Sequence, residues 1–247
     1  MNLIWEKMVV ACAIASAFTS FGAAAFAVEP GSAEEEALGK KWICTPDEKL
    51  PNVLLIGDSI SIGYTLETRA LLAGKANVYR PVLKGKDEPW NCGHTGSILA
   101  GLDRMLEGPA WDVIHFNTGL HDLKRVSRVK GGRHDDPTLP PVFSLQNYRE
   151  KLEQIVLRLK KTEAKLIFAT TTPYPGGVYP CRLPKDAVRY NKVALQIMKK
   201  HGVVINDLYS ASLPHLKQWQ IEKNVHFNPT GRQKLAEQVA VVINKQL

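Results

Sequence analysis

The sequence predicts an α/β fold, in which helices cover both faces of a parallel sheet of about five strands. After Pro51, short runs rich in Val, Ile, Leu or Phe alternate with longer amphipathic segments, the order expected when a helix connects each parallel strand to the next. The apolar runs are nearly continuous, which is typical of strands covered on both faces. The length of 247 residues suits one such domain, predicted over residues 51–247.

Five strands and three helices can be assigned individually. The strands are predicted at residues 52–57, 77–82, 112–118, 165–171 and 203–205. Helices are predicted at residues 148–161 and 187–201, because apolar side chains recur there at helical spacing and both segments end in Lys or His. A final helix is predicted to begin with Asn228 as its cap and Pro229 at its first position.

The first 27 residues have the features of a secretory signal peptide. Lys7 precedes an apolar run at residues 8–26, and Ala25-Phe26-Ala27 fits the rule for signal-peptidase cleavage. Cleavage after Ala27 predicts a secreted or periplasmic protein; an uncleaved anchor helix is the alternative. A polar lead-in follows at residues 28–50. No later segment is long and apolar enough to span a bilayer, so no stable membrane insertion is expected after cleavage.

The distribution of charge limits the possible partners. The formal net charge is +8, and part of the excess comes from a cluster between residues 124 and 133. Such a cluster can attract acidic polymers, but it is more often a solvated loop. The sequence has no zinc-finger, RNA-binding aromatic or base-reading helix pattern, so nucleic acid is not an expected partner.

The cysteines and one acidic triplet bear on metals and disulfides. Cys44, Cys92 and Cys181 remain after signal cleavage, and none has C-x-x-C spacing. One disulfide is allowed, and Cys92–Cys181 is the favoured pair because both residues follow strands, although the lead-in could wrap around. His134-Asp135-Asp136 is interpreted as a solvated loop, so a metal site is not expected there.

Four polar patterns are predicted to lie at the carboxyl edge of the sheet, three of them after predicted strands and the fourth just before the final helix. They are Gly57-Asp58-Ser59, residues 91–96 (NCGHTG), residues 117–122 (NTGLHD) and residues 225–231 (VHFNPTG). Two long Gly- and Pro-rich segments, 119–145 and 173–184, also follow strands. The carboxyl ends of parallel strands share one edge of a sheet, and ligand crevices of open α/β sheets form at that edge.

These patterns contain the residue types that acyl transfer requires. Ser59 can act as a nucleophile if a base takes its proton, and His226 can be that base. A tetrahedral oxyanion needs fixed donors. The backbone amides of Ser59 and Gly96 can supply two of them, and His121 or Asn117 can supply the third.

In this order, the four patterns resemble those of the SGNH (GDSL-type) hydrolase family, from about residue 52 to the end of the chain. The resemblance implies a flavodoxin-like three-layer α/β/α sandwich and an ester-cleaving serine hydrolase without a metal or organic cofactor. Two positions differ from the family pattern. His121 stands where the family has an amide donor, and Lys223 stands where it has the aspartate that orients the histidine. Glu222, Asn224 or a backbone carbonyl could replace that aspartate.

Each candidate residue also has a structural explanation. Ser59 could be a helix N-cap, His226 a packed loop residue, and Gly96 a turn glycine. Asp58 is predicted to bond nearby backbone, and His115 to be a core or supporting residue.

The function predicted from these patterns is that of an exported serine esterase. We expect it to remove a short acyl group, acetyl above all, from a carbohydrate by way of an acyl-enzyme. The expected partner is therefore a small-molecule or polysaccharide ester. An acetyltransferase that uses the same serine, a lysophospholipase or thioesterase, and a catalytically decayed carbohydrate-binding module are the alternatives. An enzyme predicts that His226 lies within hydrogen-bond reach of Ser59, and a decayed module predicts a gap.

Overall fold

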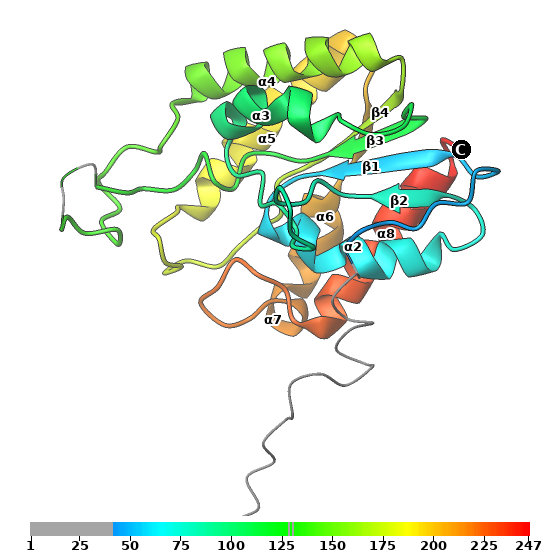
Figure 1. Ribbon diagram of the computed structural model, residues 1–247. Helices are drawn as coiled ribbons and strands as arrows, with labels where there is room; N and C mark the ends of the chain where they lie inside the picture. Colours follow the sequence, from blue (N-terminus) through cyan, green and yellow to red (C-terminus); the bar gives the residue numbers. More distant parts are fainter. Residues whose placement is uncertain (1–41, 128, 130) are drawn as a thin grey trace, which may run out of the picture.

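The centre of the molecule is a five-stranded sheet in which all strands are parallel and follow the order β2-β1-β3-β4-β5. The computed structural model describes residues 42–127, 129 and 131–247, and Figure 1 shows the sheet at its centre. The strands are β1 (Asn52–Ile56), β2 (Asn77–Tyr79), β3 (Val113–Phe116), β4 (Lys165–Ala169) and β5 (Val204–Asn206). This strand order is that of flavodoxin-like folds, which confirms the predicted fold class.

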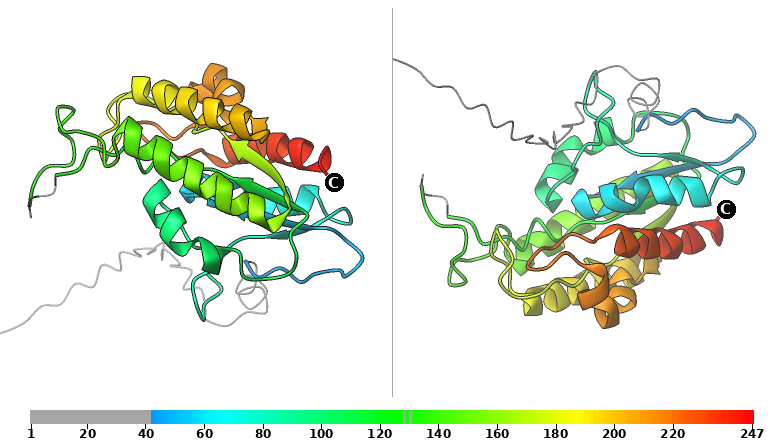
Figure 2. Two further views of the ribbon diagram at one scale, coloured as in Figure 1. Left: turned by 90° about the horizontal axis from the view of Figure 1, so that it is seen from above. Right: turned by 90° about the horizontal axis from the view of Figure 1, so that it is seen from below.

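Helices cover both faces of the sheet (Figures 1 and 2). One face carries α3 (Thr95–Met105), α4 (Leu145–Leu159) and α5 (Pro184–His201), and the other carries α2 (Ser59–Leu71) and α8 (Pro229–Asn244). The shorter elements are η1 (Lys160–Thr162), α6 (Leu208–Ser212), η2 (Leu213–His215) and α7 (Leu216–Trp219). The three layers explain why the central strands are apolar at consecutive positions: residues 53–56 and 113–116 are all buried.

Several boundaries differ from the sequence prediction. Strand β2 ends at Tyr79 rather than at residue 82, because Pro81 has no N–H to continue the ladder. Helix α4 begins three residues earlier than predicted, where the Ser144 side chain accepts the Asn147 N–H. Helix α8 begins as predicted: Asn228 caps it and Pro229 is its first residue.

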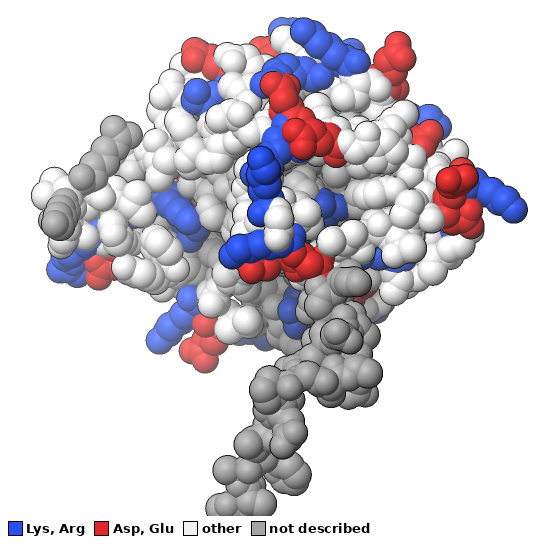
Figure 3. Space-filling model, viewed as in Figure 1, with Lys and Arg blue, Asp and Glu red and all other residues white. Residues whose placement is uncertain are grey.

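The long segment after β3 contains no regular helix or strand among its described residues, but it is anchored. Arg125 is buried and pairs with Asp186 of α5, and its backbone N–H donates to the Cys181 carbonyl at 2.8 Å. Arg133 pairs with Asp135. The described members of the basic cluster are thus partly paired, and basic and acidic side chains are interspersed on the face seen in Figure 3.

Other sequence predictions concern the ends and the thiols. The predicted signal peptide at residues 1–27 lies outside the described residues, as does the lead-in up to residue 41. Within the described part of the chain, no helix is long and apolar enough to cross a membrane. The favoured Cys92–Cys181 pair is not formed: the three described cysteines are free, and Cys92 is buried. Following a strand does not by itself bring two side chains together, because the backbone direction after the strand decides where each one lies.

Candidate active site

Ser59 is the first residue of α2 and directly follows the turn that ends β1. The cap of this helix is Asp58, whose Oδ1 accepts the Ile60 N–H at 2.9 Å. The capping role considered for Ser59 therefore belongs to its neighbour, and the Ser59 hydroxyl is available for another partner. That partner is His226, whose Nε2 lies 2.8 Å from Ser59 Oγ.

A buried arginine fixes the turn that carries the serine. The Arg80 guanidinium donates to the Gly57 carbonyl at 2.7 Å and to the Trp90 carbonyl at 3.1 Å. It also donates to Ser61 Oγ at 2.8 Å. A Cβ on Gly57 would lie 2.7 Å from the same Ser61 oxygen, so only glycine fits there. The sequence did not indicate Arg80, because an arginine that binds carbonyl groups leaves no recognisable spacing.

His226 is held by a tight loop that precedes α8. The Ile221 N–H donates to the His226 carbonyl at 3.0 Å, and an antiparallel bridge joins Gln220 to Phe227. Lys223 adopts a left-handed conformation (φ 51°) at the tip of the loop. This turn directs the next side chain, Asn224, back toward the histidine.

Asn224 is the residue that orients His226. Its Oδ1 lies 2.7 Å from His226 Nδ1 and also accepts the His226 backbone N–H at 3.1 Å. The backbone donor identifies this atom as the amide oxygen, so Nδ1 must carry the ring proton. Nε2 is then free to accept the Ser59 proton. Of the candidates predicted from sequence, Glu222 makes no such contact among the described hydrogen bonds, and Asn224 occupies the orienting position.

The surroundings keep His226 in its neutral form. Burial lowers the pKa of the imidazole, the nearby Asp58 carboxyl raises it, and the cations Arg182 and Lys124 lower it. The net direction is downward from the ordinary value. A neutral His226 at neutral pH is the form that a general base requires.

Two of the predicted oxyanion donors are backbone amides. Among the described residues, neither the Ser59 nor the Gly96 N–H has a hydrogen-bond partner, as expected in the first turn of a helix. The Cys92 N–H donates to the Gly57 carbonyl at 3.2 Å, which brings Gly93 alongside the Ser59 turn. The Gly93 N–H is not a free donor, because it binds Asn91 Oδ1 at 3.2 Å.

The two candidate side-chain donors are placed differently. Asn117 is buried, and its amide donates to the Ala169 carbonyl of β4 at 2.8 Å. It therefore links two strands. His121 lies in the turn after β3. Burial, Lys124 and Arg182, and then His94 and His226, lower its pKa to about 3. His121 is therefore neutral, and it lies near enough to His226 for the two charges to interact.

The crevice beside Ser59 is small. A cavity of about 340 Å³ is lined by Ser59, His226 and mostly apolar neighbours, including Ile62, Ile221 and Phe227. Ligand pockets generally span about 300–1,000 Å³, so this one suits a compact group.

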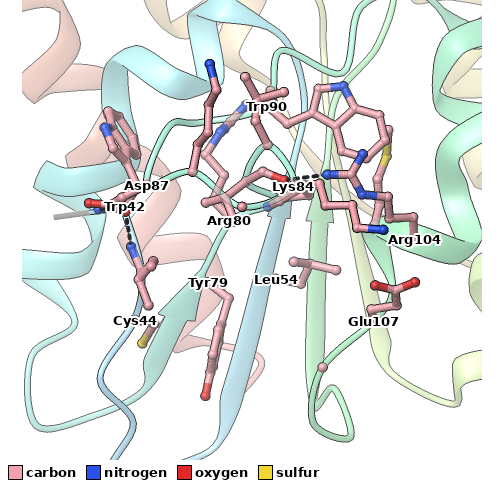
Figure 4. Close-up of a pocket in the computed structure, with 18 of the residues that line it drawn as sticks. Trp42, Cys44, Leu54, Tyr79, Arg80, Lys84, Asp87, Trp90, Arg104 and Glu107 are labelled. Carbon is pink, nitrogen blue, oxygen red and sulfur yellow. Dashed lines mark hydrogen bonds between the residues drawn. The ribbon is translucent and has the colours of Figure 1, made fainter. Parts of the chain in front are cut away.

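A larger cavity, of about 580 Å³, lies elsewhere, against the edge strand β2 (Figure 4). Several aromatic side chains that line it pack against other side chains of the protein. The Arg104 guanidinium lies over the Trp90 ring at 4.6 Å, and Tyr79 packs edge-on against Trp111. Its lining includes neither Ser59 nor His226, so we do not assign catalysis to it.

The acidic triplet at residues 134–136 does not form a metal cage. Asp135 pairs with Arg133, and Asp136 Oδ1 accepts the Thr138 N–H at 2.8 Å. No group of three or more His, Cys, Asp or Glu side chains within the described residues could hold a metal ion.

A comparison with protein families matches residues 55–234 to a model described as the GDSL-like lipase/acylhydrolase family. The matched range includes Ser59, Gly96, His121 and His226. None of the curated proteins compared with the chain matches it.

Solved structures resemble the chain in fold. A lipase/acylhydrolase from Enterococcus faecalis superposes with a TM-score of 0.61 at 20% identity, covering 80% of this chain and 97% of its own. The acetylxylan esterase Axe2 from Geobacillus stearothermophilus gives 0.60 at 18% identity, covering 78% and 94%. An acetyl xylan esterase called AlAXEase gives 0.59 at 14% identity, covering 78% and 99%. At these identities the likeness concerns the fold alone.

Proposed function

Because the chain belongs to the GDSL-like lipase/acylhydrolase family and is an acylhydrolase, we propose that it cleaves short acyl esters, acetyl above all, on a carbohydrate. The observation that carries the mechanism is the contact of 2.8 Å between Ser59 Oγ and His226 Nε2. A decayed binding module predicts a gap at this point, and the gap is absent.

The proposed reaction proceeds through an acyl-enzyme. Ser59 Oγ attacks the ester carbonyl while His226 Nε2 takes its proton. The oxyanion is bound by the Ser59 and Gly96 N–H groups and by His121. As the intermediate collapses, the ester C–O bond breaks and His226 gives its proton to the departing sugar oxygen, which leaves as a hydroxyl. A water molecule, deprotonated by His226, then releases the carboxylic acid and restores Ser59.

Two observations support a short acyl group on a sugar. The recess beside Ser59, of about 340 Å³, suits a compact group, which disfavours the long acyl chain of a lysophospholipid. Two of the proteins that share the fold are named as acetyl xylan esterases.

We also propose that the protein is exported, with cleavage after Ala27. Lys7, the apolar run at residues 8–26 and Ala25-Phe26-Ala27 support this. Sequencing the N-terminus of the protein recovered outside the cytoplasm tests it. An N-terminus at Val28 is expected, and retention of Met1 in the membrane fraction would favour an anchor.

The first test is hydrolysis of 4-nitrophenyl acetate, butyrate and octanoate by the wild type and by Ser59→Ala. We expect kcat/KM to be highest for acetate and Ser59→Ala to lose about 10⁴-fold. Ser210→Ala, which removes an exposed serine hydroxyl from α6, is the matched control and should retain full activity. Equal activity of Ser59→Ala and the wild type would contradict the assignment of the nucleophile.

A second assay addresses the carbohydrate and the acceptor. Acetylated xylo-oligosaccharides are incubated with the enzyme, and free acetate is compared with acetyl groups transferred to unacetylated oligosaccharide. Release of acetate supports a hydrolase. Transfer to the acceptor sugar would identify the acetyltransferase alternative. If neither free acetate nor a transferred acetyl group is formed, the proposed substrate class is refuted.

A further inference from the structure

His121 stands where an amide donor is expected, and an imidazole can replace that donor only when its proton is on the right nitrogen. An amide NH₂ always presents a donor, whereas a neutral imidazole has one N–H and one bare nitrogen. Its ability to stabilise an oxyanion therefore depends on which nitrogen holds the proton.

A lysine contacts the nitrogen nearer the backbone. Lys124 Nζ lies 3.1 Å from His121 Nδ1. An ammonium group has three donors and no acceptor. Nδ1 must therefore be the bare, accepting nitrogen, and the proton must lie on Nε2.

We propose that Lys124 is a positioning residue that fixes His121 in the Nε2–H tautomer, so that this ring can donate a hydrogen bond to the reaction's oxyanion. The inference rests on the proposed function for its catalytic consequence. The tautomer itself is a property of the protein alone and can be measured without a substrate.

The local backbone places the two side chains together. The Leu123 N–H donates to the Gly119 carbonyl at 3.1 Å, which closes a helical turn over residues 119–123. His121 lies within this turn and Lys124 follows it directly, so the two side chains start from neighbouring parts of the backbone. The Val142 N–H donates to the Lys124 carbonyl at 2.8 Å, so the backbone of the lysine is also held.

The same surroundings keep the histidine neutral and its backbone fixed. The Arg182 Nε donates to the Leu120 carbonyl at 2.8 Å, which anchors the residue before His121. The positive charges of Lys124 and Arg182, added to burial, oppose protonation of the ring. Protonation would make both nitrogens donors, and it would also break the contact with Lys124.

The direct test is ¹⁵N NMR of the histidine rings in the purified protein, with His121 assigned from its absence in His121→Asn. We expect the wild type to show a protonated Nε2 and a bare Nδ1 at this ring. Lys124→Met should give mixed tautomers, and Lys124→Arg should restore the wild-type pattern. A proton on Nδ1 in the wild type would overturn the proposal, whether or not the protein hydrolyses esters.

The kinetic test uses the same variants with 4-nitrophenyl acetate. Lys124→Met should lower kcat about 10-fold with little change in KM, because the donor acts on the transition state, and Lys124→Arg should restore most of the rate. Lys151→Met is the matched control. It removes a lysine whose charge also acts on His94 but which lies over the Phe143 ring instead of contacting His121, and it should change kcat less than about 2-fold.

A double variant separates positioning from a general loss of structure. In the His121→Asn background the donor is an amide that needs no tautomer control, so adding Lys124→Met should change kcat less than about 2-fold. An equal loss in both backgrounds would show that Lys124 acts through charge or folding, and would overturn the proposal. If the wild type and Ser59→Ala are both inactive, the proposed function fails and the NMR result still decides the tautomer.

Discussion

His226 and His121 carry the same ring and lie near enough for their charges to interact, yet their neighbours give them opposite hydrogen-bonding roles. At His226 the partner of Nδ1 is the Asn224 amide oxygen, an acceptor, so Nε2 is bare and can take the Ser59 proton. At His121 the partner of Nδ1 is the Lys124 ammonium, a donor. Two short-range contacts, two and three residues away in sequence, thus decide which ring is a base and which is a donor.

The strongest test of this difference in role is to make the same substitution at both histidines. An asparagine can donate a hydrogen bond but cannot act as a base at neutral pH. We expect His226→Asn to lower kcat/KM for 4-nitrophenyl acetate about 10⁴-fold, and His121→Asn to lower it less than about 10-fold. Similar losses in the two variants would show that the roles are not distinct.

Changing the acceptor at His226 should sharpen the contrast. A carboxylate stabilises the imidazolium that forms during attack, which a neutral amide does less well. Asn224→Asp should therefore raise kcat/KM at pH 8 by up to about 10-fold. Asn224→Leu, which cannot accept from Nδ1, should lower it about 100-fold. If Asn224→Asp has no higher kcat/KM than Asn224→Leu, residue 224 does not act by orienting His226.

The pH profile reports on His226 directly. Because burial lowers the pKa of His226, the acid limb of kcat/KM should fall below pH 6.5, the ordinary pKa of histidine. Asn224→Asp adds a negative charge beside the ring and should move this limb to higher pH. An acid limb above pH 6.5 in the wild type would contradict the direction derived from burial.

A third histidine, outside the crevice, provides a control on stability alone. His115 in β3 is fully buried, and burial lowers its pKa to about 3; its Nε2 lies 3.1 Å from Asn206 Nδ2. The unfolded chain takes up a proton near pH 6.5 and the folded chain does not. This residue's contribution to stability is therefore present above pH 6.5 and is lost progressively as the pH falls toward 3.

His115→Gln keeps an acceptor for Asn206 and removes this titration. We expect the variant to have a Tm a few degrees lower than the wild type at pH 7.5, because packing of the ring against Tyr64 is lost. That gap should narrow or reverse between pH 6 and 4, as measured by thermal melts. A gap independent of pH would mean that His115 is protonated equally in both states.

The sequence predicts the sheet well because its signal is local. Five apolar runs became five strands, and Asn228-Pro229 marks the start of α8. The contact between Ser59 and His226 was also predictable, since each residue lies in a short pattern at a strand or helix end. The carboxyl-edge argument was enough to bring residues 59 and 226 together.

What the sequence does not predict depends on side-chain direction. Asn224 was one of three alternatives for the orienting residue, and only the left-handed turn at Lys223 selects it. Lys124 is three residues from His121, a spacing that could have suggested the contact, but the basic cluster around it favoured a solvated loop. Arg80 binds carbonyl oxygens far away in sequence, and no pattern records such bonds.

The hydrogen bonds of Arg80 also have a consequence for thermal inactivation of the enzyme. The Arg80 guanidinium joins the Gly57 turn, the Trp90 segment and the first turn of α2 at a single buried point. The turn before Ser59 is thus bonded directly to Arg80, which follows the edge strand β2. If the turn unfolded locally, several buried carbonyl groups would lose their hydrogen bonds at once, which is costly in free energy. We therefore expect no local unfolding of the turn below the temperature at which the whole domain unfolds. Activity and native structure should then disappear together on heating, as one cooperative event.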